Sequence, residues 1–176
     1  MPDQRINIGD KKKMLSLLMA AGVGAGAALG GSYLTVPSEG WRNKPYVDPV
    51  GILTVCAGHT GKDINKNKTY TDEECLGLLA KDLWSADQYV HKVIHVPLTI
   101  NQEAALVSFT YNVGQTNLAR STLAKDFNAG HPELGCAQIL RWVYAGKHKS
   151  PGLVVRRRAE YNMCMGNDGV TNVNSN

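Results

Sequence analysis

Cysteine is scarce in this chain of 176 residues, and none of its four cysteines lies in a Cys-x-x-Cys pair. This spacing argues against a zinc ribbon and against a thioredoxin-type redox motif. The chain also has no glycine-rich nucleotide loop, no Ser-His-Asp array and no internal repeat. A nucleotide-dependent enzyme, a serine hydrolase and a repeat protein are therefore not indicated.

Net charge is low as well, at +4 from 19 basic and 15 acidic residues. A mildly basic surface suits an anionic polymer or a membrane, although an ordinary solvated surface explains the charge equally well. No DNA- or RNA-binding motif accompanies the basic residues, so we expect no nucleic-acid partner.

Charge is absent altogether from residues 14–34, which directly follow Lys11, Lys12 and Lys13. At about 1.5 Å per residue, a helix of this length just crosses a hydrocarbon core of about 30 Å. The lysines predict that the N-terminus stays in the cytoplasm and that the rest of the chain is exported. We therefore expect a signal anchor that tethers an exported domain to the inner membrane.

This run is poor in large apolar residues, because ten of the twelve residues from Ala20 to Gly31 are Gly or Ala. Small residues gain little from lipid, and Gly22, Gly26 and Gly30 recur at the spacing of a small-residue helix face. The favoured interpretation is an uncleaved anchor that later leaves the bilayer. A signal peptide cleaved near Gly30 is the second interpretation, and a buried helix of a soluble protein is the third.

Beyond residue 35 the chain is long enough for one domain with a substantial core. Residues 42–60 carry β-branched residues, Gly and Pro, and they predict a small hairpin sheet. The later apolar pattern is helical, with predicted helices over residues 72–95, 100–112, 117–128, 133–144 and 152–165. The predicted fold class is α+β, with a small β-hairpin lobe, a larger helical lobe, a cleft between them and an N-terminal hydrophobic segment.

Local signals set the predicted boundaries. Two capping boxes, Thr71 with Glu74 and Thr99 with Gln102, mark helix starts. Several predicted helices end at a glycine: Gly114, Gly130, Gly146 and Gly166. We expect a cytoplasmic lead and anchor over residues 1–35, a domain over residues 36–166 and a flexible tail over residues 167–176.

Three polar side chains stand out around the predicted hairpin. Glu39 lies at a predicted helix end, Asp48 lies in the hairpin turn, and Thr54 follows on the next strand. Two carboxyl groups across a gap suit glycoside hydrolysis, in which one protonates the leaving oxygen and the other assists water. The spacing alone fits equally an exposed acid, an Asp-Pro turn and an ordinary strand residue.

Eight residues separate Glu39 from Asp48, and five separate Asp48 from Thr54. This spacing is similar to that of the active-site triad of the phage lysozymes, glycoside hydrolase family 24. Matching motifs follow in order over residues 38–165: Gly58-His59-Thr60, Phe109 to Gly114, Ser121-Thr122-Leu123, Arg141-Trp142 and Arg156-Arg157 with Glu160. The N-terminal run resembles that of the signal-arrest-release (SAR) endolysins. Some of those carry a cysteine in the membrane segment; this run has none, so control by disulfide exchange is not expected.

The resemblance implies a lysozyme-like fold and a muramidase that cuts the β-1,4 bond between N-acetylmuramic acid and N-acetylglucosamine, which lyses the host cell. Glu39 would be the general acid, and Asp48 and Thr54 would activate water. The substrate would be peptidoglycan, and no cofactor would be needed. The enzyme would be tethered to the inner membrane through residues 14–34 and then released into the periplasm as a monomer.

Supporting residues follow from the same resemblance. Arg156 would pair with Glu39, as the family's buried arginine does with its catalytic glutamate; the alternative is a basic patch for wall polymer at residues 156–158. His59 would brace the hairpin through hydrogen bonds. Four cysteines allow three pairings, of which Cys56–Cys75 and Cys136–Cys164 suit the implied fold.

Two other functions stay open: a lytic transglycosylase, which works with a single acid, and a catalytically inactive wall-binding protein. No metal site is expected. His91 and His95 lie four residues apart on a predicted helix, but no third ligand is evident, so they are interpreted as surface histidines.

Overall fold

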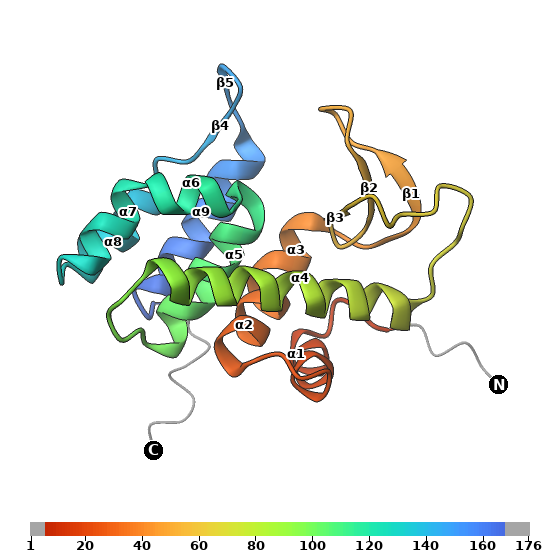
Figure 1. The fold of residues 1–176 in the computed structure, drawn as a ribbon, viewed down its shortest axis with the longest axis horizontal. Coiled ribbons are helices and arrows are strands. Elements are labelled where there is room, and N and C mark those ends of the chain that lie inside the picture. Colours follow the sequence, from red (N-terminus) through yellow and green to blue (C-terminus); the bar gives the residue numbers. More distant parts are fainter. Residues whose placement is uncertain (1–5, 168–176) are drawn as a thin grey trace.

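The computed structural model of the chain describes residues 6–167, which form a small sheet lobe and a larger helical lobe (Figure 1). The long helix α4 (Asp72–Val93) runs beneath both lobes. The predicted α+β, lysozyme-like architecture is confirmed. The predicted tail lies outside the described residues except for Asn167, and so do the first five residues of the predicted lead.

The sheet lobe is the predicted hairpin with one short addition. Strands β1 (Arg42–Val47), β2 (Leu53–Cys56) and β3 (His59–Thr60) are antiparallel in that order. Tyr46 pairs with Thr54, and the register shifts between Arg42 and Tyr46. Asp72 at the start of α4 holds this lobe in place, because its carboxylate accepts hydrogen bonds from the Trp41 indole at 3.0 Å and the Asn43 amide at 2.9 Å.

The helical lobe follows the predicted helices, with two corrections. Both capping boxes are present, at the starts of α4 and α5. The remaining helices of this lobe are α5 (Ile100–Val113), α6 (Gln115–Arg120), α7 (Thr122–Asn128), α8 (Pro132–Ile139) and α9 (Pro151–Cys164).

The first correction is that the predicted helix over residues 117–128 is two helices. Ser121 between them has an extended backbone, and its hydroxyl accepts the Ala124 N–H as the N-cap of α7. Ser and Thr favour caps because the hydroxyl competes for backbone groups. The second correction is that the helix predicted over residues 133–144 ends at Ile139.

A small hairpin replaces the end of that second helix. Strands β4 (Tyr144–Ala145) and β5 (His148–Lys149) pair across a turn in which Gly146 has a φ of +61°. Gly146 therefore forms a hairpin turn and not the helix end that the sequence predicts, whereas Gly114 does cap α5. The hairpin projects from the helical lobe opposite the tip of β1 and β2 (Figure 1).

The N-terminal hydrophobic run folds into the core of the helical lobe. It is divided into α1 (Lys11–Ala20), α2 (Ala25–Gly30), the π-helical turn η1 (Gly31–Thr35) and α3 (Val36–Glu39). Its large apolar side chains are buried in the main core: Met14, Leu18, Leu29 and Leu34. Within residues 6–167, no helix has both the length and the apolar character of a membrane span. In this structure the run is thus a buried part of the fold, the third of the predicted alternatives.

Small residues make this burial possible, because α2 lies against the backbone of α5. A Cβ atom on Gly30 would lie 2.3 Å from the carbonyl oxygen of Ala104, and one on Gly26 would lie 2.4 Å from the Glu103 carboxylate. Real Cβ atoms do not approach other atoms so closely. Gly26 and Gly30 therefore form a packing face that contacts α5, whereas Gly22, the third glycine of the predicted face, is exposed in the turn before α2.

One disulfide links the sheet lobe to α4, and a second lies within the helical lobe. Cys56 at the end of β2 is bonded to Cys75 in α4, and Cys136 in α8 is bonded to Cys164 in α9. These are the pairings that the resemblance suggests. The loops that they close span 19 and 28 residues, and each bridge contributes about 3 kcal/mol in the chain-entropy account.

Replacement of Gly30 tests the packing of the N-terminal segment. We expect Gly30→Ala to lower the free energy of unfolding by about 1–3 kcal/mol, because Ala104 is backbone and cannot rotate away. The melting temperature should fall by about 2–4 °C for each kcal/mol. Gly24→Ala is the matched control, since a Cβ there meets no atom within 4 Å, and it should change stability by less than about 0.5 kcal/mol. Equal melting temperatures for the two variants would contradict the docked arrangement.

Candidate active site

Glu39 lies where the helical lobe meets the sheet lobe. It is the last residue of α3, and Gly40, with a φ of +78°, turns the chain into β1. A side chain is strained at this φ, so glycine lets the helix end abruptly here. The predicted position of Glu39 at a helix end is confirmed.

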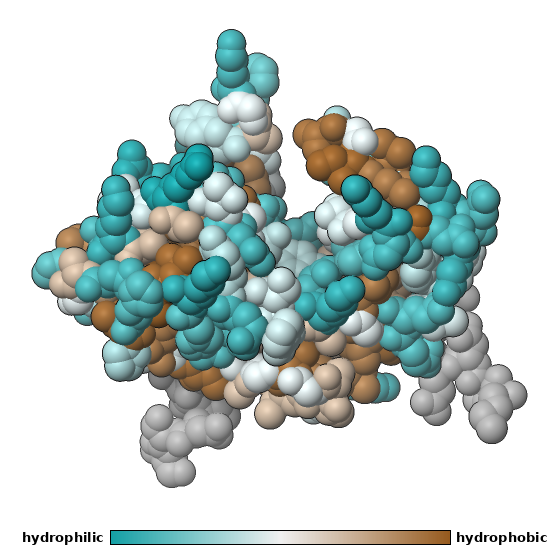
Figure 2. Space-filling model, in the orientation of Figure 1, coloured by the Kyte–Doolittle hydropathy of each residue, from teal (hydrophilic) through white to brown (hydrophobic). Residues whose placement is uncertain are grey.

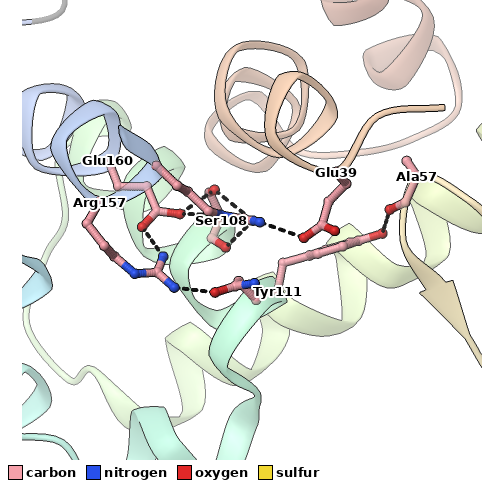
Figure 3. Close-up of polar contacts among 8 residues, drawn as sticks. Glu39, Ala57, Ser108, Tyr111, Arg157 and Glu160 are labelled. Carbon is pink, nitrogen blue, oxygen red and sulfur yellow. Dashed lines mark hydrogen bonds and ion pairs between the residues drawn. The ribbon is translucent and has the colours of Figure 1, made fainter. Parts of the chain in front are cut away.

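One oxygen of Glu39 is held by a hydrogen bond, and the other lies beside a glycine. Arg156 Nη1 donates to Glu39 Oε1 at 2.5 Å (Figure 3). Oε2 occupies space beside Gly58, where a Cβ atom would come within 2.8 Å of it. The Glu39 side chain remains 24% exposed, whereas that of Arg156 is only 5% exposed. The carboxyl group is therefore fixed from the protein side and open to a ligand on the other.

Arg156 is held in turn by a buried carboxylate. Glu160, which is fully buried in α9, accepts from Arg156 Nε at 3.0 Å and from the Ser108 hydroxyl at 2.8 Å (Figure 3). Arg156 Nη2 also donates to the carbonyl oxygen of Ser108 at 3.2 Å. Because Glu160 shares Arg156, the positive charge that faces Glu39 is already partly balanced.

Arg157 completes this network from the other side. It donates to the second oxygen of Glu160, to the Asn112 side chain and, at 2.9 Å, to the carbonyl oxygen of Trp142. Arg156 and Arg157 are both buried and only Arg158 is exposed, so the alternative of a basic surface patch over residues 156–158 is wrong. The structure supports the pairing of Arg156 with Glu39 instead.

Asp48 and Thr54 lie in the β1–β2 hairpin. Asp48 Oδ1 accepts from the backbone N–H groups of Val50 at 3.0 Å and Ile52 at 2.8 Å, which fixes the turn. Thr54 is buried, and its hydroxyl donates to the carbonyl oxygen of Ile52 at 3.1 Å. The hairpin therefore holds both residues at defined positions through local hydrogen bonds.

An open cleft of about 890 Å³ runs past Glu39. It is lined by Glu39, Pro49, Asn112, Leu153 and Arg156, and also by Lys11 and Tyr33 of the N-terminal segment. Figure 2 shows the surface hollowed between the projecting β4–β5 hairpin and the apolar tip of the sheet lobe. That tip exposes Val47, Val50 and Ile52. Pro49 places the turn that holds Asp48 at the edge of the cleft.

Several supporting residues were not identified from the sequence. Tyr111 donates its hydroxyl to the carbonyl oxygen of Ala57 at 2.7 Å and so fixes the loop that faces Glu39 (Figure 3). Burial raises the pKa of Tyr111 well above its usual range, which keeps the phenol neutral and able to donate. The pairing of Glu160 with Arg156 could have been predicted from the sequence, because opposite charges four residues apart on one helix lie next to each other.

His59 braces the base of the hairpin. Its Nδ1 lies 2.7 Å from Asp82 Oδ2 and its Nε2 lies 3.2 Å from Asp63 Oδ1. The hydrogen bond to Asp82 is the main cause of a raised His59 pKa. Because each ring nitrogen faces a carboxylate, the charged imidazolium suits the site better than either neutral tautomer.

Three comparisons with known proteins agree with this geometry. The sequence model described as phage lysozyme matches residues 37–160. The SAR-endolysin of Bacteriophage PS119 is 44% identical over 153 residues, which cover 84% of this chain and 92% of that protein. An endolysin structure from Escherichia coli O157:H7 phage FAHEc1 has a TM-score of 0.70 at 32% identity, over 77% of this chain and 90% of that one.

A second solved structure is similar over nearly the whole chain. The active form of P1 phage endolysin Lyz has a TM-score of 0.78 over 94% of this chain and 97% of that one. At 22% identity this likeness shows the fold alone.

His59 predicts a pH dependence of stability. A raised pKa means that the His59 ion pairs stabilise the fold fully below the unfolded pKa of about 6.5 and lose this effect as the pH rises through the folded pKa. We expect His59→Gln to lower the melting temperature by a few degrees near pH 6 and by much less at pH values well above the folded pKa. Thermal melts of both proteins across this range give the difference. A gap that widened with rising pH would contradict the assignment.

Proposed function

The chain belongs to the phage lysozyme family, whose muramidases digest the bacterial wall, and we propose that Glu39, Asp48 and Thr54 carry out that reaction in this chain. The observation that carries the proposal is the position of Glu39. Arg156 fixes one oxygen from inside the protein, and the 24% exposed side chain of Glu39 lines an open cleft of about 890 Å³. The substrate is then the glycan strand of peptidoglycan.

The acid step needs a proton on Glu39. With a strand in the cleft, the protonated carboxyl gives its proton to the bridging oxygen between N-acetylmuramic acid and N-acetylglucosamine. The bond from the muramic C1 atom to that oxygen then breaks, and positive charge develops on the muramic ring. The buried guanidinium of Arg156 compensates the carboxylate that remains on Glu39 and holds it in place.

The water step belongs to the hairpin. The ionised Asp48 takes a proton from a water molecule that attacks C1, and the Thr54 hydroxyl orients that water. The bonds from Val50 and Ile52 fix Asp48 Oδ1, which limits the directions from which the carboxylate meets the water. The products are two shorter glycan strands, one of which ends in a reducing N-acetylmuramic acid.

The two alternative functions predict different outcomes. A lytic transglycosylase needs the acid but no water, and it leaves an anhydro-muramic end that is one water lighter. An inactive wall-binding protein leaves the glycan intact. Mass spectrometry of digested peptidoglycan separates all three.

Substitutions in the proposed triad test the assignment. We expect Glu39→Gln to lower wall-clearing activity by at least about 100-fold, because general acid catalysis is lost. Asp48→Asn should lose most activity and Thr54→Ala less, with reducing muramic ends as the wild-type product. Circular dichroism checks that each variant is folded. Anhydro ends, or near-wild-type clearing by Asp48→Asn, would overturn the water step.

We also propose that the N-terminal run is a temporary anchor. The support is the similarity to SAR-endolysins together with an uncharged run of 21 residues behind three lysines. While residues 14–34 span the inner membrane, Glu39 is five residues from the bilayer. Five extended residues reach under about 20 Å, so α3 cannot dock against Arg156 and the tethered enzyme is inactive in the periplasm. Release lets the run fold into the core.

The exposed positions of the run allow this proposal to be tested without disturbing the docked fold. Ala20, Ala21 and Ala25 are exposed in the structure, so leucine there adds affinity for lipid without a clash. We expect the triple leucine variant to stay in the membrane fraction and to lyse cells late. The triple serine variant is the matched control and should be released early. The leucine variant, refolded from denaturant without lipid, should keep full wall-clearing activity. If the leucine variant lysed cells at the wild-type time while it was still in the membrane fraction, control by tethering would be refuted.

A further inference from the structure

A cluster of two carboxylates and one imidazole lies where α4 and α5 meet beneath the docked segment α2. Asp87 and His91 lie one turn apart on α4, and Glu103 lies in the first turn of α5. One ligand atom from each of the three residues lies within 4.8 Å of the others. None of the three lines the cleft beside Glu39, so the proposed glycosidase chemistry does not use them.

The distances suit a tetrahedral metal site. His91 Nε2 lies 3.4 Å from Asp87 Oδ1 and 3.6 Å from Glu103 Oε2. Zinc bonds to nitrogen and oxygen are about 2.0–2.2 Å long, so two ligand atoms of a tetrahedral site are about 3.3–3.6 Å apart. Both distances to His91 Nε2 fit such a site, and the two carboxylates each have a ligand atom within 4.8 Å of the other. Water would take the fourth position.

Asp87 provides a second, independent observation. Its residue is only 9% exposed, and its Oδ1 atom, which faces His91, is buried without a hydrogen-bond partner. The contact of this oxygen with charge is His91 Nε2 at 3.4 Å, which does not form a hydrogen bond. A buried carboxylate oxygen without a hydrogen bond is costly unless a cation satisfies it.

His59 shows what a satisfied arrangement of the same residue types looks like. There each ring nitrogen faces its own carboxylate, and the charges balance in pairs. In the cluster of Asp87, His91 and Glu103, both acids turn to one and the same imidazole nitrogen. One proton on that nitrogen cannot serve two carboxylates well, whereas one metal ion can.

We propose that Asp87, His91 and Glu103 bind one divalent transition-metal ion of the zinc class at the junction of α2, α4 and α5. Imidazole with carboxylates suits zinc and its neighbours, whereas magnesium and calcium prefer oxygen ligands alone. The ion would neutralise the two acids and link α4 to α5.

The docked N-terminal segment completes this site. The backbone N–H of Ala27 donates to the Glu103 carboxylate, and Gly26 leaves the room that this carboxylate occupies. Glu103 is thus aimed at His91 by α2. Since a ligand stabilises the state that binds it, the ion would favour the docked segment by mass action.

Calorimetric titration of the purified, untagged full chain with Zn²⁺ tests the proposal. We expect one Zn²⁺ per chain and a rise in melting temperature on binding, with no response to Mg²⁺. His91→Ala should weaken the affinity at least about tenfold, as should the near-isosteric Asp87→Asn. His95→Ala is the matched control, because His95 is also exposed beside the end of α4 but lies outside the cluster, and its affinity should equal that of the wild type.

Circular dichroism of the metal-free variants checks that a loss of Zn²⁺ affinity is not caused by unfolding. His91→Ala should stay folded because it changes an exposed side chain. Co²⁺ gives a second measurement, since tetrahedral coordination produces strong visible absorption that His91→Ala should abolish. Wild-type protein that binds no Zn²⁺ up to millimolar concentrations would overturn the proposal. So would His91→Ala protein that binds Zn²⁺ as the wild type does. None of these measurements uses wall-clearing activity, so the test of the metal site does not depend on whether the proposed glycosidase function is correct.

Discussion

The fully buried carboxylate of Glu160 is the constraint on which the site depends. A charge in the protein interior is tolerated only when it is paired and hydrogen-bonded, and Glu160 requires both Arg156 and Arg157 for this. Their remaining donors reach Ser108, Asn112 and Trp142, so a single anion fixes α9 against α5 and the start of the β4–β5 hairpin. The last donor of Arg156 reaches Glu39. The orientation of the Glu39 carboxyl is thus set by a network that forms only when α3, α5 and α9 are packed together.

The N-terminal segment is part of that packing. Glu39 ends a continuous helical stretch that begins at Ala25, and this stretch lies against α5 at the two glycines that allow close approach, Gly26 and Gly30. The close contact of these glycines with α5 fixes the position of the whole stretch from Ala25 to Glu39, because tightly packed interiors leave little room for movement. The position of Glu39 therefore depends on Gly30 and Gly26, which lie nine and thirteen places earlier in the chain. A change in those residues acts on Glu39 without touching the cleft.

Much of this arrangement is local and was predictable. Capping boxes, the hairpin turn and the glycine after Glu39 act within a few residues, so the sequence predicts α4, α5 and the placement of the three site residues. The break at Ser121 and the β4–β5 hairpin were missed because a serine and a glycine within an apolar helical pattern can each be interpreted in two ways. Two of the partners of Arg156, Ser108 and Glu39, are 48 and 117 residues away, and only tertiary packing brings such groups together. Glu103 was missed as a third neighbour of His91 for the same reason, since it lies on another helix.

The composition of residues 14–34 suits two environments because its apolar residues are unevenly distributed. Large side chains lie near both ends of the run, at Met14 and Leu18 and again at Leu29 and Leu34, and all four are buried in the core. The middle is mostly Gly and Ala. At about 25 cal/mol per Å² of buried apolar surface, these small residues gain little free energy in lipid, and they lose little when they are exposed to water. In the protein this middle opens into a turn at Gly22, where φ is +87°, so the two ends of the run form separate helices that pack into the same core. A run with leucine in the middle would hold the bilayer more strongly, and at Gly30 it would collide with Ala104. The same small residues thus weaken the proposed anchor and permit the close packing that orients Glu39.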